Sequence, residues 1–217
     1  MKLFLDSGDI EEIKSAYTWG GLDGVTSNPK LIAKNCPGGN KEFLHELKKM
    51  GKKHPVIITL STHEQEEMLQ EARELAELYP EIIIKLYMTE HDLELMQDLK
   101  AAGIRVHVSL IYSLNQAFLA AKAGADVISP FVGRSDDFGG DGIGLLEDVI
   151  HMVERYSFSS SVMAASLRTP FHVSEAIRLG SDIITLPYSI LLKMFRHPAT
   201  NEGIADFKSY SVNGAGK

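Results

Sequence analysis

Short apolar runs alternate with amphipathic stretches along nearly all of this 217-residue chain. Each apolar run suits one buried strand, and each amphipathic stretch has the spacing of a helix with one face in a core. Such alternation is typical of parallel sheets, because a helix crosses over between consecutive strands. The predicted strands are Leu3–Asp6, Gly24–Ser27, Val56–Leu60, Ile82–Glu90, Ile104–Leu110, Ala125–Ser129, Ser161–Ser166 and Asp182–Leu186.

Eight strand–helix units favour an α/β fold, a single (β/α)8 TIM barrel. We expect one domain over residues 1–212, with an extra C-terminal helix at Thr200–Tyr210 and a disordered tail at 213–217. An open doubly wound sheet is the alternative. No GxGxxG motif follows a strand and the sequence has no P-loop, so we expect no nucleotide cofactor.

Local signals set several helix ends. Ser61 and Glu64 have the spacing of a capping box, which predicts the start of the helix after the third strand. Thr89 is the predicted N-cap of the helix after the fourth strand. The glycine-rich segment 138–142 is expected to be a loop that leads into a helix from Leu145.

Composition narrows the class of protein. The net charge of −7 argues against nucleic acid or an anionic membrane as a partner. The one cysteine, Cys36, excludes an internal disulfide, and no Cys/His cluster suggests a metal site. The sequence shows neither a signal peptide nor a long apolar segment, so we expect a cytoplasmic protein. We also expect that it has no cofactor.

Lys85 lies in the middle of the most apolar strand, IIIKLY. A lysine in such a strand either pairs with an acid or loses its proton, because burial disfavours the ammonium form. A neutral amine beside a cleft can attack a carbonyl carbon, which is the chemistry of Schiff-base enzymes. The strand alone does not distinguish this role from that of a core lysine in a salt bridge.

Polar residues at the carboxyl ends of the other strands favour the reactive role, since a barrel places its chemistry at that face. The candidate residues at or just beyond the strand ends are Asp6, Thr26, Asn28, Thr59, Lys85, Ser109, Ser129, Arg134, Ser166 and Arg168. An eleventh candidate, Phe131, comes from the family resemblance described below. Arg134 and Arg168 follow the sixth and seventh strands, near where barrels commonly bind phosphate. One guanidinium group can donate two parallel hydrogen bonds to the oxygens of a phosphate, so we predict an anionic sugar as ligand.

Several motifs resemble the transaldolase family, in particular its short branch, which includes fructose-6-phosphate aldolases. The matching segments are Leu3–Ser7 (LFLDS), Gly24–Pro29 (GVTSNP), Ile84–Thr89 (IKLYMT), Ser129–Arg134 (SPFVGR) with Asp136 and Asp137, Ala164–Arg168 (AASLR), Thr185–Pro187 (TLP) and His197–Thr200 (HPAT). These segments follow the family's order and run from residue 3 to residue 200.

The resemblance implies a role for each matching residue. Lys85 would form the Schiff base with a ketose, and Asp6 would be the acid/base carboxylate. Thr26, Asn28 and Ser166 would contact the dihydroxyacetone portion of the sugar. Arg134 and Arg168 would lie near the phosphate. The resemblance also implies a homo-oligomer, a pentamer or a decamer.

The chain departs from the family pattern on three strands near the lysine. Tyr87 stands where a proline is usual, and alternation along the strand predicts that it points inward. Thr59, or Ser61, replaces the glutamate or glutamine that positions the catalytic water. His107 and Ser109 replace the usual Asn-x-Thr, and His107 is interpreted as a hydrogen-bonded core residue in preference to a catalyst.

The function predicted from these residues is that of a class I transaldolase, which moves a dihydroxyacetone unit from a ketose phosphate to an aldose phosphate. Phe131 favours transfer over release, because the aldolase members tend to have tyrosine there. A fructose-6-phosphate aldolase that releases dihydroxyacetone is the first alternative. An enzyme for another anionic ketose, such as a sulfonated one, and a non-catalytic sugar-phosphate sensor are further alternatives.

Overall fold

The computed structural model describes residues 1–51 and 53–213, and it describes side chains through residue 210. The strands are β1 (Lys2–Asp6), β2 (Gly24–Thr26), β3 (Val56–Thr59), β4 (Ile82–Tyr87), β5 (Arg105–Ile111), β6 (Val127–Pro130), β7 (Ser161–Ala164) and β8 (Ile183–Leu186). The helices are α1 (Ile10–Thr18), α2 (Pro29–Asn35), α3 (Gly39–Lys49), α4 (Gln65–Leu78), α5 (Glu90–Ala101), α6 (Leu114–Lys122), α7 (Val132–Asp137), α8 (Gly142–Arg155), α9 (Pro170–Arg178), α10 (Tyr188–Met194) and α11 (Pro198–Asn213).

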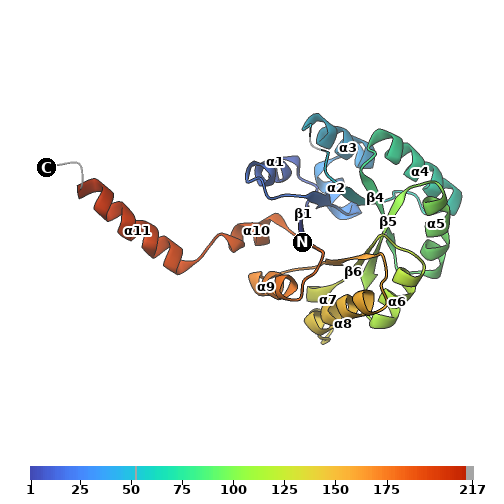
Figure 1. The fold of residues 1–217 in the computed structure, drawn as a ribbon. Helices are drawn as coiled ribbons and strands as arrows, with labels where there is room; N and C mark the ends of the chain where they lie inside the picture. Colours follow the sequence, from blue (N-terminus) through green and yellow to red (C-terminus); the bar gives the residue numbers. More distant parts are fainter. Residues whose placement is uncertain (52, 214–217) are drawn as a thin grey trace.

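The strands form a closed barrel in the order β1 to β8, and β8 pairs with β1. All the pairings are parallel, and helices surround the barrel (Figure 1). The strands are apolar on both faces because one face lines the barrel and the other packs against helices. The predicted (β/α)8 barrel with a C-terminal helix is therefore confirmed, and the open sheet is excluded.

The interior of the barrel has an apolar layer below a polar one. The apolar layer consists of Phe4, Ile57, Ile83, Val127, Met163 and Ile183. Side chains two residues apart on a strand share a face, so the next inward side chains lie one layer nearer the carboxyl ends. Five of these side chains are polar, namely Asp6, Thr59, Lys85, Ser129 and Thr185. The apolar layer is thus the floor beneath the candidate site.

The predicted capping box at Ser61 does not form. Helix α4 begins after Glu64, whose side chain makes no capping hydrogen bond. The carboxylate of Glu71 instead accepts the backbone N–H of Ser61 at 2.8 Å and that of Thr62 at 3.0 Å. The predicted cap at Thr89 is confirmed, because its hydroxyl accepts the N–H of Asp92 at 3.1 Å.

The segment after β6 is more helical than the sequence predicts. The short helix α7 was not expected, and α8 begins at Gly142 instead of Leu145. Asp141 caps α8 by accepting the N–H of Gly144 at 2.8 Å. Glycines are poor helix formers, so three of them within residues 139–142 obscured the start of this helix.

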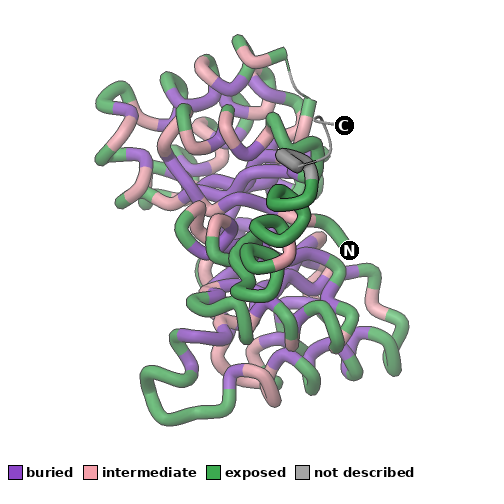
Figure 2. The backbone as a smooth tube through the Cα atoms, turned by 90° about the vertical axis from the view of Figure 1, so that its left-hand side faces the viewer, coloured by how far each residue is buried: buried purple, intermediate pink, exposed green. Residues whose placement is uncertain are grey.

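Helix α11 extends away from the barrel beyond α10 (Figure 1). It is longer than the predicted Thr200–Tyr210, and from Pro198 to Tyr210 every residue except the half-buried Gly203 is exposed, in contrast to the buried strands (Figure 2). Its exposed side chains include Ile204, Phe207 and Tyr210. The tail predicted at 213–217 begins at the last residue of this helix, and residues 214–217 lie outside the described part. Among the described helices, none is both long and apolar enough to span a membrane.

Gly24 leaves room for the ring of Phe4 in the apolar layer. A Cβ atom at residue 24 would lie 2.5 Å from the ring of Phe4. We expect Gly24→Ala to lower the free energy of unfolding by about 1–3 kcal/mol, because the fully buried ring cannot move aside without strain. Urea unfolding measures this change. Gly21→Ala is the control, since a Cβ there meets no atom within 4 Å; an equal loss in both variants would contradict the packing argument.

Candidate active site

A cavity of about 650 Å³ opens at the carboxyl ends of the strands. All eleven candidate residues line it, namely Asp6, Thr26, Asn28, Thr59, Lys85, Ser109, Ser129, Phe131, Arg134, Ser166 and Arg168. Tyr87 lines it too, so the inward direction predicted for its side chain is confirmed. Sequence positions 6 to 168 thus meet at one site, although their individual roles remain predictions.

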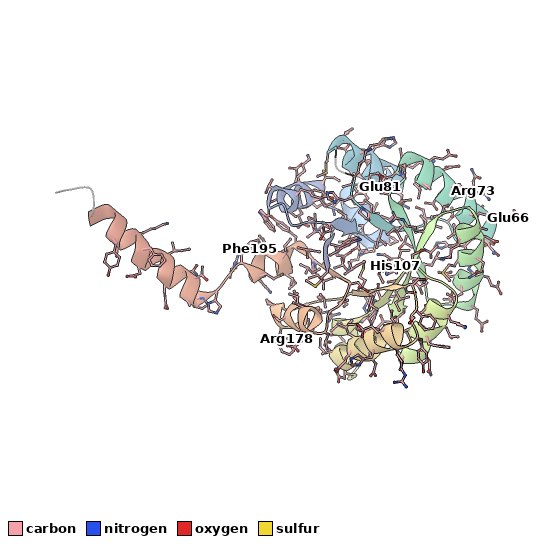
Figure 3. The ribbon with its side chains drawn as sticks, in the orientation of Figure 1. Glu66, Arg73, Glu81, His107, Arg178 and Phe195 are labelled. Atoms are coloured by element: carbon pink, nitrogen blue, oxygen red, sulfur yellow. The ribbon has the colours of Figure 1, made fainter. Side chains whose placement is uncertain are left out.

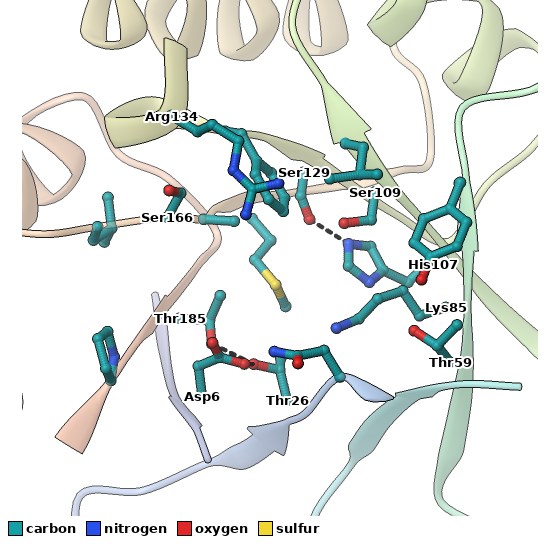
Figure 4. Close-up of a pocket in the computed structure, with 18 of the residues that line it drawn as sticks. Asp6, Thr26, Thr59, Lys85, His107, Ser109, Ser129, Arg134, Ser166 and Thr185 are labelled. Carbon is teal, nitrogen blue, oxygen red and sulfur yellow. Dashed lines mark hydrogen bonds between the residues drawn. The ribbon is translucent and has the colours of Figure 1, made fainter. Parts of the chain in front are cut away.

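Lys85 lies at the bottom of this cavity and is only 9% exposed. Its Nζ atom donates a hydrogen bond to the carbonyl oxygen of Ser27, and Figure 4 shows the side chain pointing into the cavity. Burial lowers the pKa of Lys85, and the negative charge of Asp6 partly opposes this by raising it. The amine is therefore easier to deprotonate than an exposed lysine.

Three buried polar side-chain atoms have no hydrogen-bond partner among the described residues, and two of them flank Lys85. They are Ser27 Oγ, Thr59 Oγ1 and His107 Nδ1, and they are the whole set of such side-chain atoms in the described part of the chain. Thr59 and His107 are the register partners of Lys85 on β3 and β5. Buried polar groups are nearly always paired in folded proteins. Unpaired atoms gathered on both sides of one lysine indicate a place that receives a polar ligand.

Asp6 is held by a chain of hydroxyl groups from two neighbouring strands. Thr26 Oγ1 donates to Asp6 Oδ1 at 2.8 Å and lies 2.7 Å from Thr185 Oγ1 (Figure 4). Because the single proton of Thr26 goes to Asp6, Thr185 is the donor in the second bond. This chain of hydroxyl groups fixes one carboxylate oxygen, and no residue in the described part of the protein donates a hydrogen bond to the other.

His107 is buried in the centre of the barrel (Figure 3). Its Nε2 atom is hydrogen-bonded to Ser129 Oγ (Figure 4). Burial, and then the positive charge of Lys85, hold the pKa of His107 well below its usual value. A neutral imidazole next to the lysine adds no second positive charge, which fits its interpretation as a hydrogen-bonded residue. Its free Nδ1 atom nevertheless borders the cavity.

Arg134 packs over an aromatic pair at the mouth of the cavity. Its guanidinium carbon lies 5.3 Å from the centre of the Phe131 ring, in cation–π geometry. The ring of Tyr112 meets Phe131 edge to face at 5.8 Å, and Arg134 Nη1 donates to the Tyr112 hydroxyl at 3.4 Å. The other N–H groups of the Arg134 guanidinium remain available to donate hydrogen bonds to an anion.

Arg168 is the second cation at the mouth, and it forms an ion pair with Asp137. Its side chain passes Gly133, where a Cβ atom would lie 2.9 Å from Arg168 Cδ and 2.5 Å from the carbonyl oxygen of Ser166. Ser166 has a φ angle of +59°, which is rare for a residue with a side chain. Such strain is concentrated at functional sites.

Two residues that line the cavity, Thr185 and Lys30, were not predicted from the sequence as site residues. Thr185 was noted only as part of a motif, although its place two residues after the buried Ile183 puts it in the polar layer. Lys30 lines the mouth but lies in α2, where no strand pattern points to it. Within the described residues, no three His, Cys, Asp or Glu side chains are grouped as a metal ion requires.

The fold and the site together define a (β/α)8 barrel with a buried lysine and two arginines at one polar cavity. Solved structures share the barrel: thiamine phosphate pyrophosphorylase from Pyrococcus furiosus matches with a TM-score of 0.58 and 16% identity over 86% of this chain and 85% of that one. N-acetylmannosamine-6-phosphate 2-epimerase from Clostridium perfringens matches with a TM-score of 0.59 and 16% identity over 87% of each chain. At this identity the likeness concerns the fold alone.

Sequence comparison is more specific. The model of the transaldolase/fructose-6-phosphate aldolase family matches residues 3–214, and the chain belongs to that family. A probable transaldolase from Kosmotoga olearia is 43% identical, with 95% of this chain and 94% of the relative covered. A probable transaldolase from Clostridium tetani is also 43% identical, with 95% and 96% covered. These matches confirm the family resemblance and support a transaldolase-type enzyme.

The lowered pKa of His107 predicts a dependence of stability on pH. Below about pH 6.5, the usual histidine pKa, the unfolded chain takes up a proton at this residue while the folded chain does not. Stability is therefore lost as the pH falls from about 6.5 toward the folded pKa, by up to about 1.4 kcal/mol per pH unit. His107→Asn should remove this part of the slope in urea unfolding measured between pH 7 and pH 5.

The exposed His63 provides the control for this measurement. His63→Asn should leave the slope unchanged, because folding does not bury this side chain. A slope that is the same in wild type and His107→Asn would show that His107 takes up a proton in the folded protein.

Proposed function

We propose that the chain is a class I transaldolase that transfers a dihydroxyacetone unit from a ketose phosphate to an aldose phosphate. The observation that carries the proposal is the buried Lys85 amine, with the unpaired atoms of Thr59 and His107 on the neighbouring strands, at the bottom of a cavity with two arginines at its mouth. Membership of the family gives the type of reaction. The arrangement of the residues suggests how each would take part.

In the proposed reaction the neutral amine of Lys85 attacks the ketose carbonyl carbon, and water leaves as the iminium forms. The iminium withdraws electrons from the neighbouring carbon–carbon bond, and Asp6 accepts the hydroxyl proton as that bond breaks. The aldose phosphate departs and leaves an enamine on Lys85. Attack of the enamine on a second aldose phosphate, followed by addition of water, gives the new ketose and restores the amine.

The arginines are proposed to bind the phosphate. Arg134 and Arg168 line the same cavity as Lys85, and Figure 4 shows Arg134 on the far side of it from the lysine. A sugar would therefore extend from Lys85 toward the arginines. Guanidinium groups remain charged and donate in parallel to anionic oxygens. The same pair could bind a sulfonate, so an anionic ketose of that kind remains an alternative substrate. The non-catalytic sensor is disfavoured because a sensor does not need a buried amine.

Release of dihydroxyacetone is the second candidate function, and the unpaired hydroxyl of Thr59 favours it. Release needs a polar group to orient the water that attacks the iminium. Thr59 Oγ1 is buried next to Lys85 without a partner, so it is available for this purpose. Against release stands Phe131, whose phenyl ring offers no hydrogen bond. We therefore propose transfer as the main activity and slow release as a side reaction.

The direct test supplies fructose 6-phosphate with and without an aldose phosphate acceptor. We expect the transfer product to form faster than free dihydroxyacetone, and Lys85→Met to abolish both while the fold persists, since methionine has a similar shape. Nuclear magnetic resonance distinguishes the two products. Release that matches or exceeds transfer would identify the chain as an aldolase, and full activity in Lys85→Met would reject the mechanism.

The role of the arginines is tested by replacing Arg168. Arg168→Ala should raise KM for phosphorylated substrates about ten- to a hundredfold, because a charge-assisted hydrogen bond contributes roughly 1.5–3 kcal/mol. KM for unphosphorylated analogues should change little. Arg178→Ala is the matched control, because Arg178 also pairs with an acid, Glu175, but lies outside the cavity. Equal losses for both classes of substrate would show that Arg168 is structural.

A further inference from the structure

Asn40 lies outside the cavity, and it is hydrogen-bonded to the carboxyl end of β3, which carries Thr59. It is the second residue of α3 and is 7% exposed. Its Nδ2 atom lies 3.0 Å from the carbonyl oxygen of Thr59 and 3.0 Å from Ser61 Oγ. Since Thr59 is the last residue of β3, this bond holds the backbone where the sheet ladder stops.

Glu71, in the second turn of α4, completes the arrangement. Its Oε2 atom accepts the N–H of Ser61 at 2.8 Å and both the N–H and the hydroxyl of Thr62 at 3.0 Å, while Oε1 accepts from Asn40 at 3.1 Å. One carboxylate therefore receives four donors, and bonds to a charged acceptor are stronger than neutral ones. We call Asn40 and Glu71 together the β3–α4 clamp.

The direction of the Thr59 hydroxyl depends on this clamp. Thr59 Oγ1 has no hydrogen-bond partner in the described part of the chain, so no bond of its own fixes the side chain. Its direction follows from the backbone at Thr59, and the clamp holds the carbonyl group of that same residue. A shift of this peptide plane would turn the hydroxyl away from Lys85, its register partner on β4.

We propose that Asn40 and Glu71 are positioning residues for the water step at Lys85, acting through Thr59. This inference rests on the proposed Schiff-base function. In that step water adds to the carbon of the C=N bond, the C–N bond breaks, and a proton returns to the amine as dihydroxyacetone leaves. Thr59 Oγ1 orients the water, and the clamp keeps Thr59 Oγ1 in place.

The test compares two isotope exchanges with dihydroxyacetone alone. Oxygen-18 from water enters the carbonyl group each time the imine forms and is hydrolysed. Deuterium from D2O enters the adjacent carbon each time the bound iminium becomes an enamine and returns. The ratio of deuterium to oxygen exchange, corrected for the reaction without enzyme, counts enamine events per hydrolysis. It does not depend on how much of a variant is folded.

Thr59→Val, Asn40→Ala and Glu71→Ala should each raise this ratio about five- to tenfold, as expected for the loss of one well-placed hydrogen bond. Glu71→Gln keeps the size of the side chain and serves if Glu71→Ala does not fold. Glu74→Gln is the matched control, because Glu74 lies one turn further along α4 in an exposed ion pair with Lys41 at 2.8 Å. It should leave the ratio unchanged.

The double variant Thr59→Val/Glu71→Ala decides whether the clamp acts through Thr59. If it does, the ratio should equal that of Thr59→Val, since coupled residues are not additive. Fold changes that multiply would overturn the inference, and so would an unchanged ratio in the clamp variants. If the wild-type protein exchanges no oxygen above background, the proposed function itself fails, which is a different result.

Discussion

The burial of the Lys85 amine is the condition on which the rest of the site depends. An ammonium group loses most of its hydration at the bottom of the cavity, so the neutral amine becomes more stable relative to the ammonium form. The surroundings of Lys85 limit the shift of the equilibrium between its ammonium and neutral forms. Asp6 supplies one negative charge, Ser27 supplies a carbonyl acceptor, and His107 stays neutral. The amine is thereby held in the folded barrel with a lowered pKa.

The two-residue period of the strands connects this condition to the fold. The layer of Phe4, Ile57 and Ile83 closes the barrel below, and the next inward residues on the same strands are Asp6, Thr59 and Lys85. Short strands suffice on β1, β3, β4, β6 and β8, because one apolar residue for the floor is followed two residues later by one polar residue for the site. The segments that follow the strands add the arginines of the cavity, and helices α3 and α4 add the clamp on Thr59.

Much of this arrangement was predictable from the sequence, because strand–helix alternation and strand ends are local patterns. The barrel and the placement of ten candidate residues at one cavity followed from them, and the family resemblance added the eleventh, Phe131. Contacts between residues far apart in the sequence were not predictable: Ser61 has the spacing of a cap for α4, yet its N–H is bonded to Glu71 inside that helix and its hydroxyl to Asn40 of α3. The ion pair of Arg168 with Asp137 depends on the unexpected helix α7. The homo-oligomer stays a prediction.

The central claim is that Lys85 itself forms the covalent bond with the sugar. The most direct measurement treats the protein with fructose 6-phosphate and borohydride, which reduces an imine to a stable amine, and then locates the adduct by peptide mass spectrometry. Our account predicts one adduct, on Lys85, with the mass of a reduced dihydroxyacetone or hexose phosphate unit. An adduct on another lysine, or none with any ketose phosphate, would contradict it.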